Sequence, residues 1–299
     1  MTILMISPQA IPQLLIDNFQ LKNMNPSQTI IYSDLDGTLF NGRNEIGWTD
    51  LAAISEYIDA GGRFAVATGR APQNALGFFW GLRQNAPAIV MNGAGAYDFS
   101  AGEYLFCEQM DRGRLDPFLT ELLASFPDLE LQVYTDKDIC YCLPEERCQP
   151  TLLRLHRPCV FGSFGDTLGR PLIKCLLYCP PELDEALGAA LAEAAPGCYH
   201  LVPGTVNVEG ERIHYYEIMP ENVTKALALE RLRSHPLLSG RTVIAAGDNW
   251  NDMEFLRAAD VAVTPANAIP ELKALSRFTT VDNEHNVVAH IITDVLPKL

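Results

Sequence analysis

Short apolar segments alternate with helical patterns through residues 29–97, and the same alternation resumes at residue 241. Residues 29–34 and 63–68 are continuous apolar runs, which is typical of strands buried on both faces of a parallel sheet. The helical pattern between them ends at the pair Gly61 and Gly62, a common way to terminate a helix. This alternation predicts an α/β fold with a doubly wound, Rossmann-like parallel sheet.

The same patterns predict the remaining elements and a second domain. Strands are expected at residues 87–92, 241–248, 260–264 and 278–281, and helices at 49–62, 71–82, from about 222, 251–259, 267–275 and 285–296. Residues 98–215 break this rhythm, because strand and helix signals are mixed there and all eight cysteines lie between Cys107 and Cys198. We predict an α+β domain at residues 98–215, inserted into a core formed by residues 29–97 and 216–299. Residues 1–28 are expected to be an N-terminal extension.

Charge and composition exclude several classes of partner. The 299 residues carry a formal net charge of −15, which disfavours a nucleic-acid or anionic membrane surface. No apolar run is long enough to span a bilayer, and no basic residue precedes Lys22, so neither a membrane span nor a signal peptide is expected. We therefore expect a cytoplasmic protein. The cysteine spacings lack the paired motif of a zinc site, which favours reduced thiols.

Four of the predicted strands end on a small polar residue. These residues are Asp34, Thr68, Asn92 and Asp248. For any one strand an ordinary polar turn explains the pattern, because turns are rich in such residues. In a doubly wound sheet, however, ligands bind at the carboxyl ends of the strands. Four such residues together, two of them acidic, favour a binding or catalytic site.

The segment Asp-Leu-Asp-Gly-Thr places two carboxylates, Asp34 and Asp36, beside a turn at Gly37. Like charges at this spacing repel, and a hard cation with oxygen ligands would relieve the repulsion. Asp34 could then act as a nucleophile and Asp36 as its acid/base partner. The alternative is an acidic turn exposed to solvent.

A second acidic pair, Asp248 and Asp252, follows the strand at 241–248. Asp252 alone could serve only to complement a helix dipole, an effect of about 0.3–1 kcal/mol. Lys225 is expected in the first turn of its helix, where a cation opposes the dipole. It is therefore either an exposed lysine of little consequence or a residue that meets the acids over a bound anion.

Two glycine-containing turns could hold a phosphate group. Thr68, Gly69 and Arg70 combine a hydroxyl, a flexible residue and a helix start, and helix N-termini present free N–H groups. Asn92 and Gly93 follow the next strand and could equally form a simple turn. Each of these motifs is weak by itself.

Taken together, these residues resemble the haloacid dehalogenase superfamily of phosphatases, and in particular its Cof-type branch with a large α/β cap. The matching motifs, in order, are Asp-Leu-Asp-Gly-Thr-Leu at 34–39, Thr68, Lys225, and Gly-Asp-x-x-Asn-Asp at 247–252. The inserted domain falls where that superfamily carries its cap. The resemblance covers residues 29–97 and 216–290, and the cap itself shows no match.

The resemblance implies a mechanism for a Mg²⁺-dependent phosphomonoester hydrolase. Asp34 would attack phosphorus to form an aspartyl-phosphate, and Asp36 would protonate the leaving alcohol and then activate water. The Mg²⁺ ligands would be Asp34, the backbone carbonyl of Asp36, Asp248 and Asp252, the last directly or through water. Thr68 and Lys225 would hold the phosphoryl oxygens. The other residues expected to bind substrate are Gly69, Arg70, Asn92, Gly93 and Asn251.

Two departures from the family pattern affect loops only. Residues 264–268 read Thr-Pro-Ala-Asn-Ala where Gly-Asn-Ala is common, and Asn286 stands where a glycine is usual. Asn tolerates a left-handed backbone, so the turn at Asn286 can survive.

The expected substrate is a small phosphorylated metabolite, such as a sugar phosphate or a phosphorylated cofactor. A phosphomutase that uses the same aspartyl-phosphate stays open, as does a signalling or non-catalytic phosphate-binding protein. In the cap, Arg154, Arg157, Lys174 and His200 could contact substrate, although a surface or packing role is favoured for each. Cap hinges are expected near residues 97–100 and 213–219. The oligomeric state cannot be read from the sequence.

Overall fold

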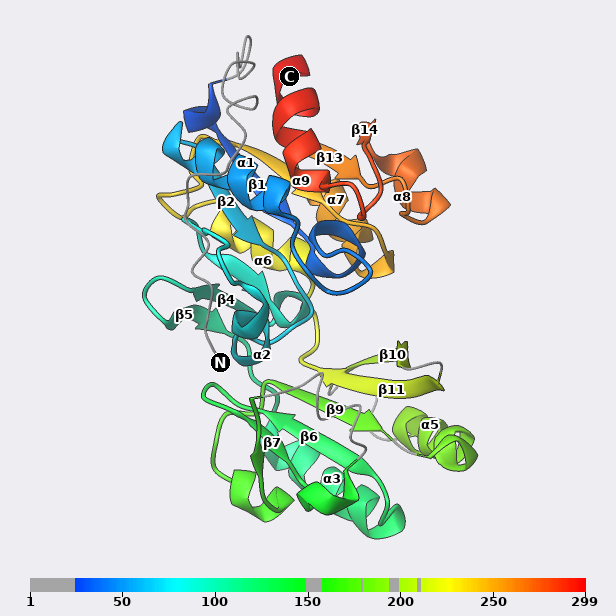
Figure 1. Ribbon diagram of the computed structural model, residues 1–299. Coiled ribbons are helices and arrows are strands. Elements are labelled where there is room, and N and C mark those ends of the chain that lie inside the picture. The colour runs from blue at the N-terminus through cyan, green and yellow to red at the C-terminus, as the bar shows by residue number, and fades with distance from the viewer. Residues whose placement is uncertain (1–24, 149–157, 179, 194–198, 209–210) are drawn as a thin grey trace, which may run out of the picture.

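The computed structural model describes residues 25–148, 158–178, 180–193, 199–208 and 211–299, and Figure 1 shows that these form two stacked parts. One part contains the parallel sheet and the C-terminal helices, and the other contains most of the inserted domain. Of the predicted N-terminal extension, only residues 25–28 lie within the described part of the chain. There, Pro26–Gln28 form a single 3-10 turn before the first strand.

A five-stranded parallel sheet with the order β14-β13-β12-β1-β2 forms the centre of the first part, which confirms the predicted α/β class. Its strands are β1 (Thr29–Ser33), β2 (Arg63–Val66), β12 (Thr242–Ala246), β13 (Val261–Thr264) and β14 (Phe278–Thr279). Every residue of β1 is buried, as its continuous apolar pattern predicted.

The chain leaves β1 and β12 in opposite directions along this sheet. From β1 it passes through α1 (Trp48–Asp59) to β2, and from β12 through α7 (Met253–Ala258) to β13. Because such crossovers are right-handed, these two helices lie on opposite faces of the sheet. The direction therefore reverses between β1 and β12, and in folds of this kind ligands bind outside the carboxyl ends of the strands at that point.

The remaining core helices pack in pairs against this sheet. α9 (Val287–His290) lies beside α1, and α6 (Lys225–Leu232) lies beside α7, which in turn contacts α8 (Pro270–Leu275). The backbone of Asn286 is left-handed, with φ of 64°, as expected at the start of α9. The helix predicted at residues 71–82 is much shorter, because α2 (Pro72–Ala75) has only one turn, a 3-10 turn follows, and Gly81 has φ of 79°.

A three-stranded antiparallel sheet extends the core part beyond the predicted boundary at residue 98. β3 (Ala88–Val90) pairs with β4 (Gly95–Asp98), and β4 pairs with β5 (Glu103–Cys107). A parallel bridge from Ala67 to Ile89 joins β3 to the end of β2. The predicted hinge at residues 97–100 is therefore wrong, since it falls within this hairpin.

The inserted domain, here called the cap, is built on a six-stranded sheet with the order β10-β11-β9-β6-β7-β8. Its strands are β6 (Glu130–Tyr134), β7 (Ile139–Tyr141), β8 (Val160–Phe161), β9 (Lys174–Tyr178), β10 (His200–Val208) and β11 (Glu211–Met219), and its helices are α3 (Arg112–Ser125) and α5 (Asp184–Glu193). β11 is paired on both sides, so we propose that the second hinge lies just after the predicted range 213–219 rather than within it. Composition marked the inserted segment but could not show which strands its ends join. We therefore propose cap boundaries near Glu108 and Pro220.

Alternate residues of the cap strands face opposite ways, and this divides the cap sheet into two faces. Leu131, Val133, Cys175, Leu177 and Ile218 pack with α3 and α5 in a separate apolar cluster. Tyr134, Leu176 and Tyr178 point the other way and belong to the large core cluster. A residue's position along the strand therefore decides whether it supports the cap or faces the core.

Two further expectations concern the described residues. The cysteines Cys107, Cys140, Cys142, Cys148, Cys159 and Cys175 are all free thiols, as predicted. Within the described ranges, none of the helices combines the length and apolar character that crossing a bilayer requires.

A buried carboxylate links α1 to α9. Asp50 lies in the first turn of α1, is 2 % exposed, and accepts a hydrogen bond from the backbone N–H of Ala289 at 2.8 Å. Burial raises the pKa of Asp50 to about 6, although hydrogen bonds from the Ala289 and Val288 backbones and the charge of His290 oppose the rise. Folding therefore favours the protonated form of this group.

We predict that Asp50→Asn reduces the loss of stability as pH rises. Below about pH 4, Asp50 is protonated in both the folded and the unfolded wild-type protein, and its contribution to the free energy of unfolding is fully present. As pH rises through about 6 this contribution is lost, which lowers the free energy of unfolding by at most ~3 kcal/mol. Urea unfolding should show the variant gaining about 1–3 kcal/mol relative to wild type between about pH 4 and about pH 8. A stability difference that stays constant with pH would contradict this account.

Candidate active site

The turn after β1 brings two acids of distant sequence together. The backbone N–H of Asp34 bonds to Ala246 of β12 at 2.8 Å, so Asp34 continues the pairing of the two strands. Gly37 has φ of 81°, and a Cβ there would lie 2.4 Å from Oδ2 of Asp248. Only glycine therefore lets this turn approach Asp248, whose Oδ1 accepts a hydrogen bond from the Thr38 hydroxyl at 3.0 Å.

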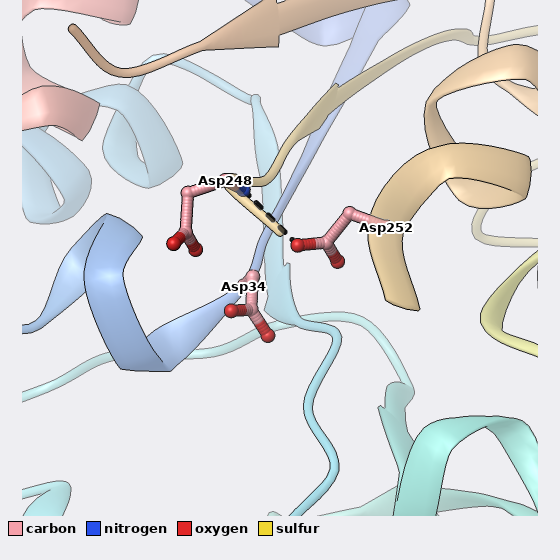
Figure 2. A group of neighbouring side chains, drawn as sticks. All are labelled: Asp34, Asp248 and Asp252. Atoms are coloured by element: carbon pink, nitrogen blue, oxygen red, sulfur yellow. Dashed lines mark hydrogen bonds between the residues drawn. The ribbon is translucent and has the colours of Figure 1, made fainter. Parts of the chain in front are cut away.

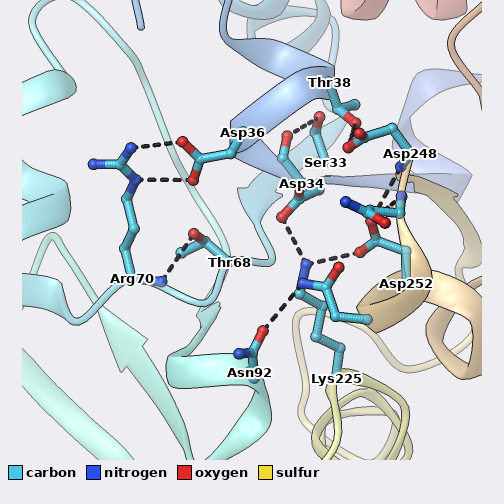
Figure 3. Close-up of polar contacts among 12 residues, drawn as sticks. Ser33, Asp34, Asp36, Thr38, Thr68, Arg70, Asn92, Lys225, Asp248 and Asp252 are labelled. Atoms are coloured by element: carbon cyan, nitrogen blue, oxygen red, sulfur yellow. Dashed lines mark hydrogen bonds and ion pairs between the residues drawn. The ribbon is translucent and has the colours of Figure 1, made fainter. Parts of the chain in front are cut away.

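Lys225 lies at the centre of the acidic group. Its Nζ donates to Oδ1 of Asp34 at 2.6 Å and to Oδ1 of Asp252 at 2.7 Å, and its side chain is completely buried (Figure 3). It is the first residue of α6, which Thr224 caps by accepting the N–H of Leu227. The cation thus lies at the unfavourable end of a helix dipole, where the two carboxylates compensate it.

The carboxylates of Asp34, Asp248 and Asp252 converge on one point. One oxygen from each lies within 4.8 Å of the others, and Figure 2 shows the three side chains as neighbours at the centre of the site. Burial raises the pKa of Asp34 well above its ordinary value, with Lys225 opposing the rise and Asp252, Asp248 and Asp36 adding to it. Burial, followed by the charge of Asp252, raises the pKa of Asp248 to about 6.

One lysine does not balance three converging acids. Burial alone would lower the pKa of Lys225, yet the charges and hydrogen bonds of Asp252 and Asp34 outweigh it and the pKa is raised, so the lysine stays protonated. Three carboxylates against one ammonium still leave an excess of negative charge, which adds to the effect of burial in raising the pKa values of Asp34 and Asp248. Hard oxygen donors in this excess fit a divalent cation such as Mg²⁺.

Asp252 serves both its own helix and the lysine. Its Oδ2 accepts from the backbone N–H groups of Asp248 and Asn249 at 3.0 and 3.3 Å, which closes the turn before α7. A Cβ on Gly247 would lie 2.4 Å from Cγ of Asp252, so this turn also depends on a glycine. Asp252 therefore does more than complement a helix dipole, because its Oδ1 also accepts from Lys225.

Asp36 is held away from the other acids. Arg70 binds its carboxylate with two hydrogen bonds, from Nε at 2.9 Å and from Nη2 at 2.5 Å. The guanidinium also packs over the rings of Phe78 and Phe40, at 4.5 and 5.5 Å from the ring centroids. Arg70 thus contacts Asp36 where the sequence suggested a substrate contact, and Figure 3 shows this pair apart from Lys225.

The two predicted phosphate-holding turns lie side by side. The buried Thr68 accepts the backbone N–H of Arg70 with its hydroxyl at 3.1 Å, and the Asn92 backbone N–H bonds to the Thr68 carbonyl at 3.0 Å. Asn251 donates from its side chain to Oδ1 of Asn92 at 3.2 Å. Gly93 has another role, because a Cβ there would lie 2.1 Å from the Thr224 carbonyl. Its close approach positions the start of α6, and with it Lys225.

A cavity of about 580 Å³ lies over these turns, between the core and the cap. Asp34, Asp36, Gly69, Arg70, Asn92 and Asn251 line its core side. Its cap side is lined by aromatic, aliphatic and two charged residues, which are Tyr134, Lys174, Leu176, Tyr178, Val202, Pro203, Gly204, Tyr215 and Glu217. Gly93 is not among the lining residues. A volume of this size suits a small molecule.

Sequence reasoning missed most of the cap side of this cavity. Of its four suggested cap contacts, Lys174 lines the cavity, His200 does not, and Arg154 and Arg157 lie outside the described residues. The two-residue periodicity of residues 174–178 carried the missing signal, since Lys174, Leu176 and Tyr178 share one face. Glu217 and Tyr215 on β11 share the same periodicity.

The loop that departs from the family pattern supports the acidic turn. Asn267 donates from its side chain to the Gly37 carbonyl at 2.8 Å and accepts the backbone N–H of Asn283 at 2.9 Å. The altered residues ahead of Asn267 therefore leave this contact with the acid motif in place.

Comparisons with known proteins agree with this geometry. Residues 31–292 match the family model described as haloacid dehalogenase-like hydrolase. Two proteins of Bacillus subtilis named 5-amino-6-(5-phospho-D-ribitylamino)uracil phosphatase are similar: YitU is 23% identical over 91% of this chain and 98% of its own, and YwtE is 26% identical over 88% and 96%. A haloacid dehalogenase-like hydrolase from Bacteroides thetaiotaomicron matches in fold with a TM-score of 0.74 and 22% identity, covering 89% of this chain and 99% of that one.

We predict that Lys225→Met destabilises the metal-free protein strongly. Removing the ammonium leaves the carboxylates of Asp34 and Asp252 buried without a cation, which should cost about 3–5 kcal/mol at neutral pH. Adding Asp252→Asn should recover part of the loss. Chemical unfolding in chelator-treated buffer measures this, with the exposed Lys137→Met as a control that changes little. Wild-type stability in Lys225→Met would show that the lysine does not balance the acids.

Proposed function

This chain belongs to the haloacid dehalogenase-like hydrolases and is a phosphatase, and we propose that it hydrolyses phosphate monoesters of small metabolites with Mg²⁺ and an aspartyl-phosphate intermediate. The observation that carries the proposal is the buried Lys225 bridging Asp34 and Asp252 beside Asp248. A structural ion pair needs two partners, whereas this group holds more negative charge than the lysine balances. That surplus suits a divalent cation, whose positive charge would in turn offset that of a reacting phosphate.

Asp34 is the proposed nucleophile. Its Oδ1 accepts from Lys225, which fixes the carboxylate and opposes the rise in its pKa that burial causes. A carboxylate oxygen of Asp34 forms a bond to phosphorus as the bond from phosphorus to the leaving oxygen breaks. The side chain lines the floor of the cavity, so a phosphoryl group placed there meets it directly.

Asp36 is the proposed acid and base. It gives a proton to the leaving oxygen in the first step. In the second step it takes a proton from water as the water oxygen attacks phosphorus, which breaks the bond to Asp34 and releases phosphate. In this conformation Asp36 is bound by Arg70 and is half exposed, so it must leave that pair to reach the substrate.

The proposed Mg²⁺ ligands are the side chains of Asp34, Asp248 and Asp252 and the backbone carbonyl of Asp36. When bound, the ion neutralises charge on the phosphoryl oxygens and on the acids around it. Thr68 and the turns at Gly69 and Asn92 then hold the phosphoryl group from the side facing the cap.

The substrate is proposed to be a sugar phosphate or a phosphorylated cofactor. The cavity has room for a small leaving group, and its cap side is lined by aromatic, aliphatic and paired charged residues. The two Bacillus relatives are named for a phosphate ester of a ribityl chain on a uracil ring. That ester therefore belongs in the first substrate panel, together with hexose phosphates.

Asp34→Asn should abolish hydrolysis of p-nitrophenyl phosphate while the protein stays folded, because an amide is not a nucleophile toward phosphorus. Release of p-nitrophenol measures activity, and circular dichroism measures folding. Substitution of Asp294 by Asn, an acid on the surface far along the chain, should leave the rate unchanged. Near-wild-type activity of Asp34→Asn would refute the mechanism.

Removal of divalent metal should stop the reaction, and added Mg²⁺ should restore it. The measurement is phosphate release by chelator-treated protein before and after titration with MgCl2. Activity that persists in metal-free protein would remove Mg²⁺ from the account.

With a sugar monophosphate as substrate, free phosphate without an isomeric product identifies a phosphatase, whereas an isomeric sugar phosphate identifies a phosphomutase.

A further inference from the structure

The cavity has a roof made by one face of the cap sheet. Every second residue of β9, from Lys174 to Tyr178, faces the cavity and the core below the cap. Tyr215 and Glu217 of β11 lie beside these residues. The residues between them pack on the far side against α3 and α5. Among the residues described as lining the roof, only Lys174 and Glu217 carry charge.

These two residues form a buried ion pair. Nζ of Lys174 lies 2.5 Å from Oε1 of Glu217, and the residues are 4 % and 8 % exposed. Burying two charges costs several kcal/mol of desolvation, and a pair of apolar side chains at such positions is often as stable or more so. The pair is therefore poorly explained as a stabilising element of the cap, and its contacts to the core suggest another role.

Both members of the pair reach across to the core. The second carboxylate oxygen of Glu217 accepts from Nδ2 of Asn92 at 3.3 Å, and Lys174 donates to the Gly69 carbonyl at 3.4 Å. Asn92 in turn accepts from Asn251 at 3.2 Å. A continuous chain of hydrogen bonds thus runs from the Gly69 turn through the cap pair to the Asn92 turn and on to the loop of Asp252.

This chain of hydrogen bonds fixes the orientation of the Asn92 side-chain amide. Its Nδ2 faces Glu217 and its Oδ1 faces Asn251, so exchanging the two atoms would break both hydrogen bonds. The Asn92 backbone is left-handed, with φ of 52°, a conformation that costs free energy in a residue other than glycine. Within the described ranges, Glu217 is the only side chain that accepts from this Nδ2, and Asn92 itself lines the cavity.

We propose that Lys174 and Glu217 are positioning residues through which the closed cap orients Asn92 and the Gly69 turn toward the phosphoryl group. This inference rests on the proposed function of the same site. The pair carries no net charge, so it places no extra cation or anion next to the leaving group. The pair acts instead on residues that face the phosphoryl group. Every phosphate monoester has this group.

This role makes a specific kinetic prediction. Loss of the pair should lower kcat/KM by a similar factor for esters with unrelated leaving groups, whereas a pair that recognised the leaving group would affect some esters and spare others. The two test substrates are p-nitrophenyl phosphate and a hexose monophosphate. The central variant is Lys174→Met/Glu217→Leu, which removes both charges together and so leaves no buried ion unpaired.

We expect kcat/KM of this double variant to fall about tenfold for both esters, the effect of about one or two lost hydrogen bonds. Lys174→Met/Glu217→Gln should retain most activity, because it leaves no buried ion unpaired and its amide oxygen can still accept from Asn92. Adding Asn92→Ala to the double variant should cause little loss beyond that of Asn92→Ala alone, since the pair acts through Asn92. Asp116→Asn, which breaks the Arg112 ion pair on the far side of the cap, should match wild type.

Three results would overturn the inference: an unchanged kcat/KM, a loss confined to one ester, or losses that multiply fully with Asn92→Ala. Calorimetric binding of inorganic phosphate provides a readout that does not depend on turnover. If wild type binds phosphate without hydrolysing esters, the proposed function fails, and weaker phosphate binding by the double variant would still support the positioning role. Phosphate binding equal to wild type in the double variant would refute that role.

Discussion

The structure of the site depends on one buried ammonium shared between two carboxylates. Lys225 binds Asp34 at the end of β1 and Asp252 at the start of α7, so it joins segments separated by more than 190 residues. Several features of the fold serve this contact. Gly37 and Gly247 let the two acidic turns approach, and Gly93 lets the Asn92 turn pack against the start of α6. The remaining negative charge on the cluster is the physical reason to expect a divalent cation.

Much of the core could be predicted because its signals are local. Continuous apolar runs identified the parallel strands, and polar residues at their ends identified the edge of the sheet where the site lies. Asp34, Asp248, Asp252 and Lys225 do converge, although each motif alone was weak. The sequence could not show that Arg70 binds Asp36, because that contact depends on how Phe40 and Phe78 pack under the guanidinium.

The cap was predicted less well, because its structure depends on pairing between strands far apart in sequence. Residues 98–107 look like the start of an insertion, yet they belong to the hairpin of β4 and β5 that extends the core from β3. Residues 216–219 look like a return to the core, yet they belong to β11 and complete the cap sheet. Lys174 and Glu217 are separated by 43 positions, and only the pairing of β9 with β11 brings them together over the cavity.

The central claim is that Asp34 carries the phosphoryl group during turnover. Its most direct test is rapid mixing with substrate, an acid quench within one turnover, and peptide mapping by mass spectrometry after borohydride reduction of the acyl phosphate. Cleavage after Lys22 and Arg43 yields one peptide that contains both Asp34 and Asp36, and fragment ions distinguish them. The account predicts modification at Asp34 alone. Modification at Asp36 or elsewhere, or hydrolysis with no covalent phosphoenzyme at any time, would contradict it.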